Sequence, residues 1–93
     1  MAVDLLAPHI ERVEARLDDA IGVTQKLYVT WQGIAANTGA PTSVVTVFAI
    51  SDPTVFLSQA DWDNMWTDAK GQFLGTFGLT APTDNPVQLP EGP

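Results

Sequence analysis

Few side chains in this 93-residue sequence could take part in acid–base or metal chemistry. His9 is the only histidine, and no nearby serine or acid is arranged with it as a catalytic dyad or triad would require. The absence of cysteine excludes disulfides, thiolate metal sites and cysteine nucleophiles. One histidine cannot supply the several ligands of a transition-metal site. We therefore predict neither a metal nor another cofactor.

Carboxylates are the remaining candidates for catalysis. Asp61, Asp63 and Asp68 could in principle support hydrolysis by carboxylates alone. On a helix, Asp61 and Asp68 would lie on one face about two turns apart. Residues 61–64 begin like a calcium loop, but Met65 and Trp66 stand where an oxygen ligand and a glycine are needed. Helix capping and solubility explain these aspartates without chemistry, so we predict that the protein is not an enzyme.

The three tryptophans are the other residues that could form a binding site. Trp31, Trp62 and Trp66 could stack on a sugar or a base, and Trp62 and Trp66 are one helical turn apart. Tryptophans on a helical apolar stripe are more often anchors of a core or an interface. We therefore interpret all three as packing residues.

The spacing of apolar residues predicts a long helix from Ile10 to Ala35. The steps alternate between three and four, as in the heptad of a coiled coil, through Ile10, Val13, Leu17, Ala20, Thr24, Leu27, Trp31 and Ile34. The start falls between Asp4, a good N-cap, and Pro8. Asn37 to Gly39, followed by Pro41, is expected to end the helix. Such a helix would be about 40 Å long.

Three further segments complete the predicted fold. Residues 44–50 are β-branched and aromatic, which favours a buried strand, with a short helix as the alternative. Residues 55–57 either return as a second strand or lead into a helix. That amphipathic helix opens at Ser58 with a capping box completed by Asp61, and is expected to fray between Gly71 and Phe77. The fold class is thus α+β, mainly α, with one domain over residues 1–80 and an extended proline-rich tail over 81–93.

Composition points to a protein that works through its contacts. The net charge is −7 and only four residues are basic, so no nucleic acid is expected as a partner. No apolar run is long enough to span a membrane, and no signal peptide is indicated. Because 45% of residues are hydrophobic and only 16% charged, we expect a homo-oligomer or a larger protein scaffold to cover apolar surface. The predicted interface residues are Ile10, Val13, Leu17, Leu27, Trp31, Ile34, Trp62 and Trp66.

Two functions follow from these expectations. The first is a non-enzymatic structural or assembly protein that acts through oligomeric or partner interfaces. The second is a small acidic regulatory module, an inhibitor or polyanion mimic, for a basic partner. In its short acidic cysteine-free chain, heptad-like N-terminus, small β element and proline-rich tail, the sequence resembles small accessory virion proteins of tailed bacteriophages. That resemblance implies a virion location; without it we expect the cytoplasm.

Overall fold

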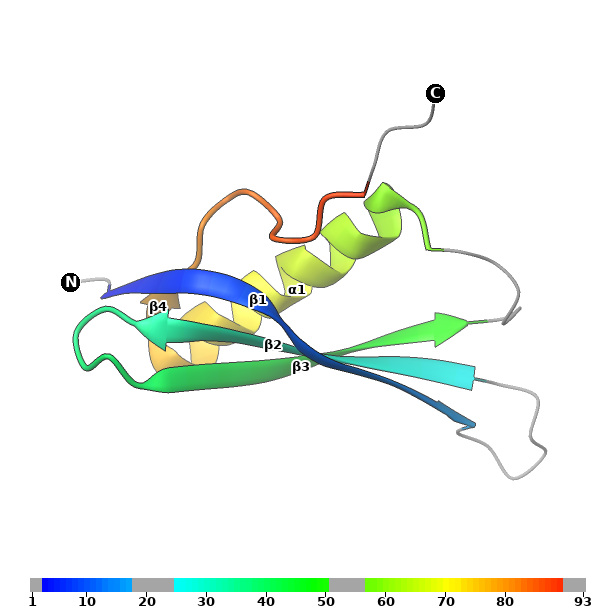
Figure 1. Ribbon diagram of the computed structural model, residues 1–93, viewed down its shortest axis with the longest axis horizontal. Coiled ribbons are helices and arrows are strands. Elements are labelled where there is room, and N and C mark those ends of the chain that lie inside the picture. Colours follow the sequence, from blue (N-terminus) through cyan, green and yellow to red (C-terminus); the bar gives the residue numbers. More distant parts are fainter. Residues whose placement is uncertain (1–2, 18–24, 51–56, 90–93) are drawn as a thin grey trace.

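The computed structural model describes residues 3–17, 25–50 and 57–89. It contains the strands β1 (Val3–Leu17), β2 (Gln25–Ala35), β3 (Pro41–Ile50) and β4 (Leu79–Thr80), and the helix α1 (Gln59–Phe77). The strands form one sheet in the order β3-β2-β1-β4, antiparallel except for β4, which pairs in parallel with β1. The helix crosses one side of the twisted sheet (Figure 1). The molecule measures 45 × 39 × 17 Å, and its shortest dimension is the thickness of one sheet layer and one helix layer.

The predicted long helix is wrong, and with it the coiled coil and the mainly α fold class. Residues 3–17 and 25–35 are two antiparallel strands, paired from Leu5 opposite Ala35 to Leu17 opposite Gln25. The predicted seam residues Ala20 and Thr24 lie outside the described residues. The fold is therefore mainly β, and α1 is the one helix in the described residues.

Two irregularities in β1 contribute to the false heptad. From Leu6 to His9 the strand advances three residues while its partner β2 advances two, and from Ile10 to Arg12 it advances two against one. Each irregularity inserts one unpaired residue, as a β-bulge does. Ala7, inside the first, has a φ of 50°. The second bulge brings Ile10 and Val13, which are three residues apart, to the face that carries the helix. The four-residue step from Leu27 to Trp31 is two periods of the regular strand β2, so the series imitates a heptad although Leu6 and Ile34 lie on the other face.

The third strand confirms that residues 44–50 form a strand, so the helical alternative is wrong, but the prediction that this strand is buried is also wrong. Burial alternates along β3: Val44 and Thr46 are buried, and Val45 and Val47 are exposed. The segment expected to end the helix instead forms the β2–β3 turn. There Gly39 adopts a φ of 71° and its N–H donates to the carbonyl of Ala35 at 2.8 Å. A left-handed residue at this place favours glycine.

The second predicted helix is confirmed, including its first residues. Ser58 is the N-cap: its Oγ accepts from the Asp61 N–H, and the Asp61 carboxylate accepts from the Ser58 N–H at 2.9 Å. The fraying predicted between Gly71 and Phe77 is not seen, because the helix is continuous to Phe77 and is capped by Gly78 in the left-handed conformation. For residues 55–57 we predicted either a second strand or a lead into the helix; most of this segment lies outside the described residues.

The core lies between the sheet and α1 and is built around tryptophan. The Trp31 ring lies 5.3 Å from the Trp66 ring and 6.5 Å from the Trp62 ring, measured between centroids. These aromatic contacts join β2 to the helix. The core also contains Leu5, Val29, Ala35, Val44, Met65, Ala69, Phe73 and Leu79. In the described residues, no helix is both long enough and apolar enough to cross a membrane.

Candidate functional site

One face of the sheet has no helix over it in the described part of the chain, and we call it the open face. Side chains on a strand alternate between faces, so the open face receives the residues that alternate with the buried ones. Four aliphatic side chains there are substantially exposed: Leu6 (48%), Ile34 (40%), Val45 (45%) and Val47 (50%). Because an exposed aliphatic group gains by leaving water, this face is a candidate contact surface.

The strand register divides the open face into two aliphatic areas. Leu6 lies opposite Ile34 at one end, while Val45 and Val47 lie opposite Thr30 and Tyr28 further along. A polar row lies between them, where Gln32 Nε2 donates to Ser43 Oγ at 3.4 Å. The valine area adjoins the outer edge of the sheet.

That outer edge is formed by β3, the strand at one end of the sheet. The Ala35 N–H donates to the Ala40 carbonyl, so residues 35 and 40 form a hydrogen-bonded pair. Such pairs recur at every second residue of an antiparallel ladder, so the even-numbered residues of β3 bond to β2. The N–H and C=O groups of Ser43, Val45 and Val47 therefore point outward. Consistently, the outward carbonyl of Val45 accepts a hydrogen bond at 2.8 Å from Nε2 of Gln72 on α1. No strand in the described part of the chain pairs with these outward groups.

The opposite edge of the sheet is protected. β4 pairs with β1 only at Val3 and Asp4. Beyond them, β1 carries Pro8, its two bulges and the charged pair Arg12–Glu14, whose charged groups lie 3.3 Å apart. Prolines, bulges and charges are the features by which natural edge strands avoid pairing.

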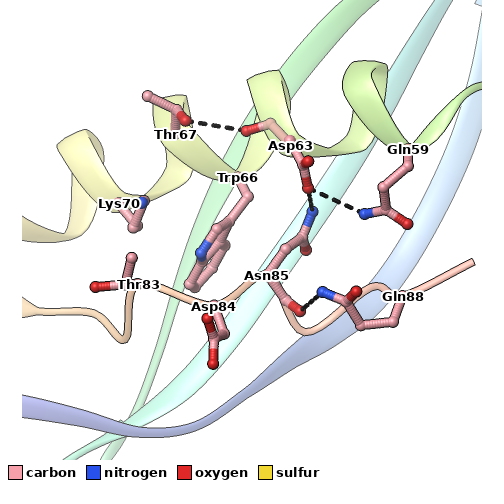
Figure 2. Close-up of a pocket in the computed structure, with 9 residues that line it drawn as sticks. All are labelled: Gln59, Asp63, Trp66, Thr67, Lys70, Thr83, Asp84, Asn85 and Gln88. Carbon is pink, nitrogen blue, oxygen red and sulfur yellow. Dashed lines mark hydrogen bonds between the residues drawn. The ribbon is translucent and has the colours of Figure 1, made fainter.

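A second surface feature is a polar cleft of about 250 Å³ between α1 and the segment 81–89. Figure 2 shows the side chains of the helix turned toward those of the segment. The lining residues are Gln59, Asp63, Trp66, Thr67, Lys70, Thr83, Asp84, Asn85 and Gln88.

The polar groups of this cleft hold the segment 81–89 against the helix. Asp63 Oδ1 accepts from Asn85 Nδ2 at 2.9 Å and from Gln59 Nε2 at 3.0 Å (Figure 2). Gln59 also donates to the carbonyl of Val87 and accepts from the N–H of Leu89, as a neighbouring peptide group would. The hydrogen bonds from Asn85 and Gln59 lower the pKa of Asp63, and the charge of Lys70 adds to this effect. We call Gln59, Asp63 and Asn85 the latch.

The aspartates considered for catalysis are engaged in structural roles. Asp61 completes the helix cap, Asp63 belongs to the latch, and Asp68 accepts from Gln72 at 3.4 Å. The described residues contain no group of three or more histidines and carboxylates that could hold a metal ion. The indole Nε1 of Trp66 is buried and has no hydrogen-bond partner in the described part.

The predicted interface residues are scattered over the structure rather than gathered on one surface. Trp31 and Trp66 lie in the core, and Ile10, Leu27 and Trp62 pack partly against it. Val13 and Ile34 are exposed, but on opposite faces of the sheet. The side chain of Leu17 lies outside the described residues.

Sequence reasoning missed three of the four aliphatic residues of the open face, Leu6, Val45 and Val47, as well as the latch. The signal for Val45 and Val47 was the alternation within residues 44–50, which assigns every second residue to a different face. No comparable signal in the sequence joins Gln59 and Asp63 to Asn85.

Comparison with known proteins gives no relative: the chain matches no protein-family model, no curated protein and no solved structure. The structure itself therefore carries the functional argument.

Proposed function

We propose that this protein is a non-enzymatic assembly protein that associates with itself through the open face and the adjoining β3 edge. The observation that supports it best is the group of exposed aliphatic side chains on the open face, at Leu6, Ile34, Val45 and Val47. Removing each of these from water contributes roughly 1–2 kcal/mol in the most favourable case. The protein needs no bound group for this role.

Electrostatics restricts where copies of the chain can meet. Each copy carries a net charge of −7, so contact through charged surface would be unfavourable. The open face offers the uncharged residues Ser43, Val45 and Val47 along β3. Arg12 and Glu14 of β1 also lie on the open face, opposite Thr30 and Tyr28, and their opposite charges lie 3.3 Å apart.

The experiment is to measure the mass of the purified protein in solution at micromolar concentration. We expect a mass above the 10.0 kDa of one chain. Val45→Lys and Val47→Lys should lower it, because each buries an ammonium group in the interface. Leu74→Lys is the matched control: Leu74 is equally aliphatic and 57% exposed, but lies on α1, so the mass should not change. A monomeric wild-type protein would overturn the proposal.

Salt separates this function from the alternative of an acidic module for a basic partner. Aliphatic association should persist as salt is raised, since screening acts on exposed charges. Binding to a basic partner should instead weaken steeply. A role in a virion, which the compositional resemblance implies, stays a prediction.

A further inference from the structure

We propose that β3 pairs edge to edge with β3 of a second copy, antiparallel, so that two four-stranded sheets become one of eight strands. This inference rests on the proposed self-association and names its contact as the β3 edge; the open faces of the two copies then lie on the same side of the joined sheet, so edge pairing brings the valines together but does not cover Leu6 and Ile34. The outward backbone groups of Ser43, Val45 and Val47 supply the hydrogen bonds. The Val45 carbonyl already accepts from the Gln72 amide, so pairing requires this carbonyl to accept a second hydrogen bond or to release Gln72.

The β3 edge of the sheet is regular and uncharged, whereas the β1 edge is irregular and charged. Over Pro41–Ile50, β3 carries no charged residue and pairs with β2 without a register shift. The β1 edge carries Pro8, two bulges and several charges. A long, regular, uncharged edge is a template for another strand, whereas the β1 edge is not.

A second copy fits this edge better than an unrelated strand does. Two negatively charged molecules can bring identical uncharged strands together without opposing like charges. Antiparallel pairing of a strand with itself creates a two-fold axis, which uses the free edge of both copies at once. Because the remaining edges are the protected β1 edges, assembly through strand edges stops at two copies.

Centring the pair on Val45 or on Thr46 would pair nine residues of β3 in either case, but only the register centred on Thr46 leaves Pro41, which has no N–H, outside the pairing. When the axis passes through Thr46, Val45 lies opposite Val47 of the second copy, and Ser43 opposite Ala49. This register pairs residues 42–50 throughout. It also brings the valines of both copies together on the open face, where the valine area already adjoins the edge. Centring the pair on Val47 instead would leave the first residues of the strand without partners in the opposing β3.

Disulfide trapping tests the register, and the chain has no native cysteine to interfere. Ser43→Cys and Ala49→Cys variants are prepared separately, mixed and oxidised. Residues in a hydrogen-bonded antiparallel pair have Cα atoms about 5.5 Å apart, within disulfide range. We expect the mixture to form a covalent dimer that joins one variant to the other. Each variant alone is the control. The cysteines of two identical copies would lie six residues apart along the paired strands, a distance of about 20 Å, so they should not form a disulfide.

A proline variant tests the same contact without cross-linking. The Val47 N–H points away from β2, so Val47→Pro removes an outward donor and leaves the β2–β3 ladder intact. We expect a folded monomer by circular dichroism and mass, while Val47→Ile remains a dimer.

The outcomes distinguish this inference from the function on which it rests. Association that is sensitive to Val47→Lys, without a mixed disulfide and with Val47→Pro still associated, would overturn edge pairing but leave assembly through the open face. A wild-type monomer would overturn both.

Discussion

The indole Nε1 of Trp31 donates a 2.9 Å hydrogen bond to Oγ1 of Thr46 on the neighbouring strand, and both side chains are almost completely buried. Thr46 lies opposite Val29 and therefore diagonally across from Trp31 on the same face. The bond provides an acceptor for one of the two buried indole N–H groups of the core. The other, on Trp66, has none in the described residues. Thr46 is thus the polar residue that permits a tryptophan at the centre of this sheet.

Replacing Thr46 with valine should therefore destabilise the protein although the two side chains have nearly the same shape. Thr46→Val leaves the Trp31 N–H buried without an acceptor, which costs roughly 1–3 kcal/mol. Urea denaturation followed by tryptophan fluorescence measures the change. Thr30→Val is the control, since Thr30 lies on the open face of β2 and is only half-buried. Equal stability of the two variants would contradict the role assigned to the bond.

Gly33 is required by its contact with Leu5. A Cβ placed on Gly33 would approach Cδ1 of Leu5 to 2.6 Å, well inside van der Waals contact. Gly33→Ala should then destabilise the protein by about 1–3 kcal/mol, the usual cost of overpacking.

Two companion variants make the Gly33 prediction specific. Gly71→Ala, in α1 with nothing near its Cβ, should stabilise the protein by about 0.5–1 kcal/mol. Leu5→Ala removes the clashing atoms, so adding Gly33→Ala to it should cost less than in the wild type. Thermal or urea unfolding compares these four variants with the wild type, and additive effects of Leu5→Ala and Gly33→Ala would argue against the clash.

The sequence allowed the elements with regular patterns to be predicted, and failed where β1 is irregular. The strand at 44–50 and the helix opening at Ser58 depend on local signals: a run of β-branched and aromatic residues and a capping box. In β1, the bulges between Leu6 and His9 and between Ile10 and Arg12 shift the core-facing positions. The second bulge produces the three-residue step from Ile10 to Val13 that resembled a heptad, and only the pairing of β1 with β2 reveals the bulges.

The candidate surfaces were harder to predict because they depend on which elements meet. The exposure of Val45 and Val47 follows once α1 is known to cover the other face of β3. The latch brings Asn85 to Asp63 across 22 positions, a contact that no spacing rule indicates. Trp31 and Trp66 were correctly recognised as packing residues, but they pack in the core of one chain and not in the predicted interface.

Removing the helix cap should weaken α1 and the core that it covers. In Ser58→Ala the Asp61 N–H loses its acceptor and the reciprocal cap is broken, which costs about 0.5–2 kcal/mol. Ser58→Asn, another good N-cap, should retain most of the stability. Chemical denaturation measures both, and a loss as large for asparagine as for alanine would contradict capping as the cause.

Docking of the segment 81–89 should depend on the charge of Asp63. The hydrogen bonds from Asn85 and Gln59 favour the ionised carboxylate and lower its pKa below the ordinary aspartate value. Because the folded pKa is the lower one, the stabilisation is fully present above the pKa of the unfolded chain. It is lost as the pH falls through the folded pKa, that is, below about pH 4. Protonation then removes charge from the acceptor Oδ1 that Asn85 and Gln59 share.

Amide hydrogen exchange at Leu89, whose N–H donates to Gln59 Oε1, reports this docking directly. In the wild type its protection should decrease as the pH is lowered below 4, after correction for intrinsic exchange. In Asp63→Asn protection should be lower at neutral pH and insensitive to acid, since no charge is left to neutralise. Asp84→Asn is the control: Asp84 lines the same cleft, and the described part of the chain gives it no latch hydrogen bond, so the wild-type pH dependence should remain. An acid-sensitive Leu89 in Asp63→Asn would assign the effect to a different carboxylate.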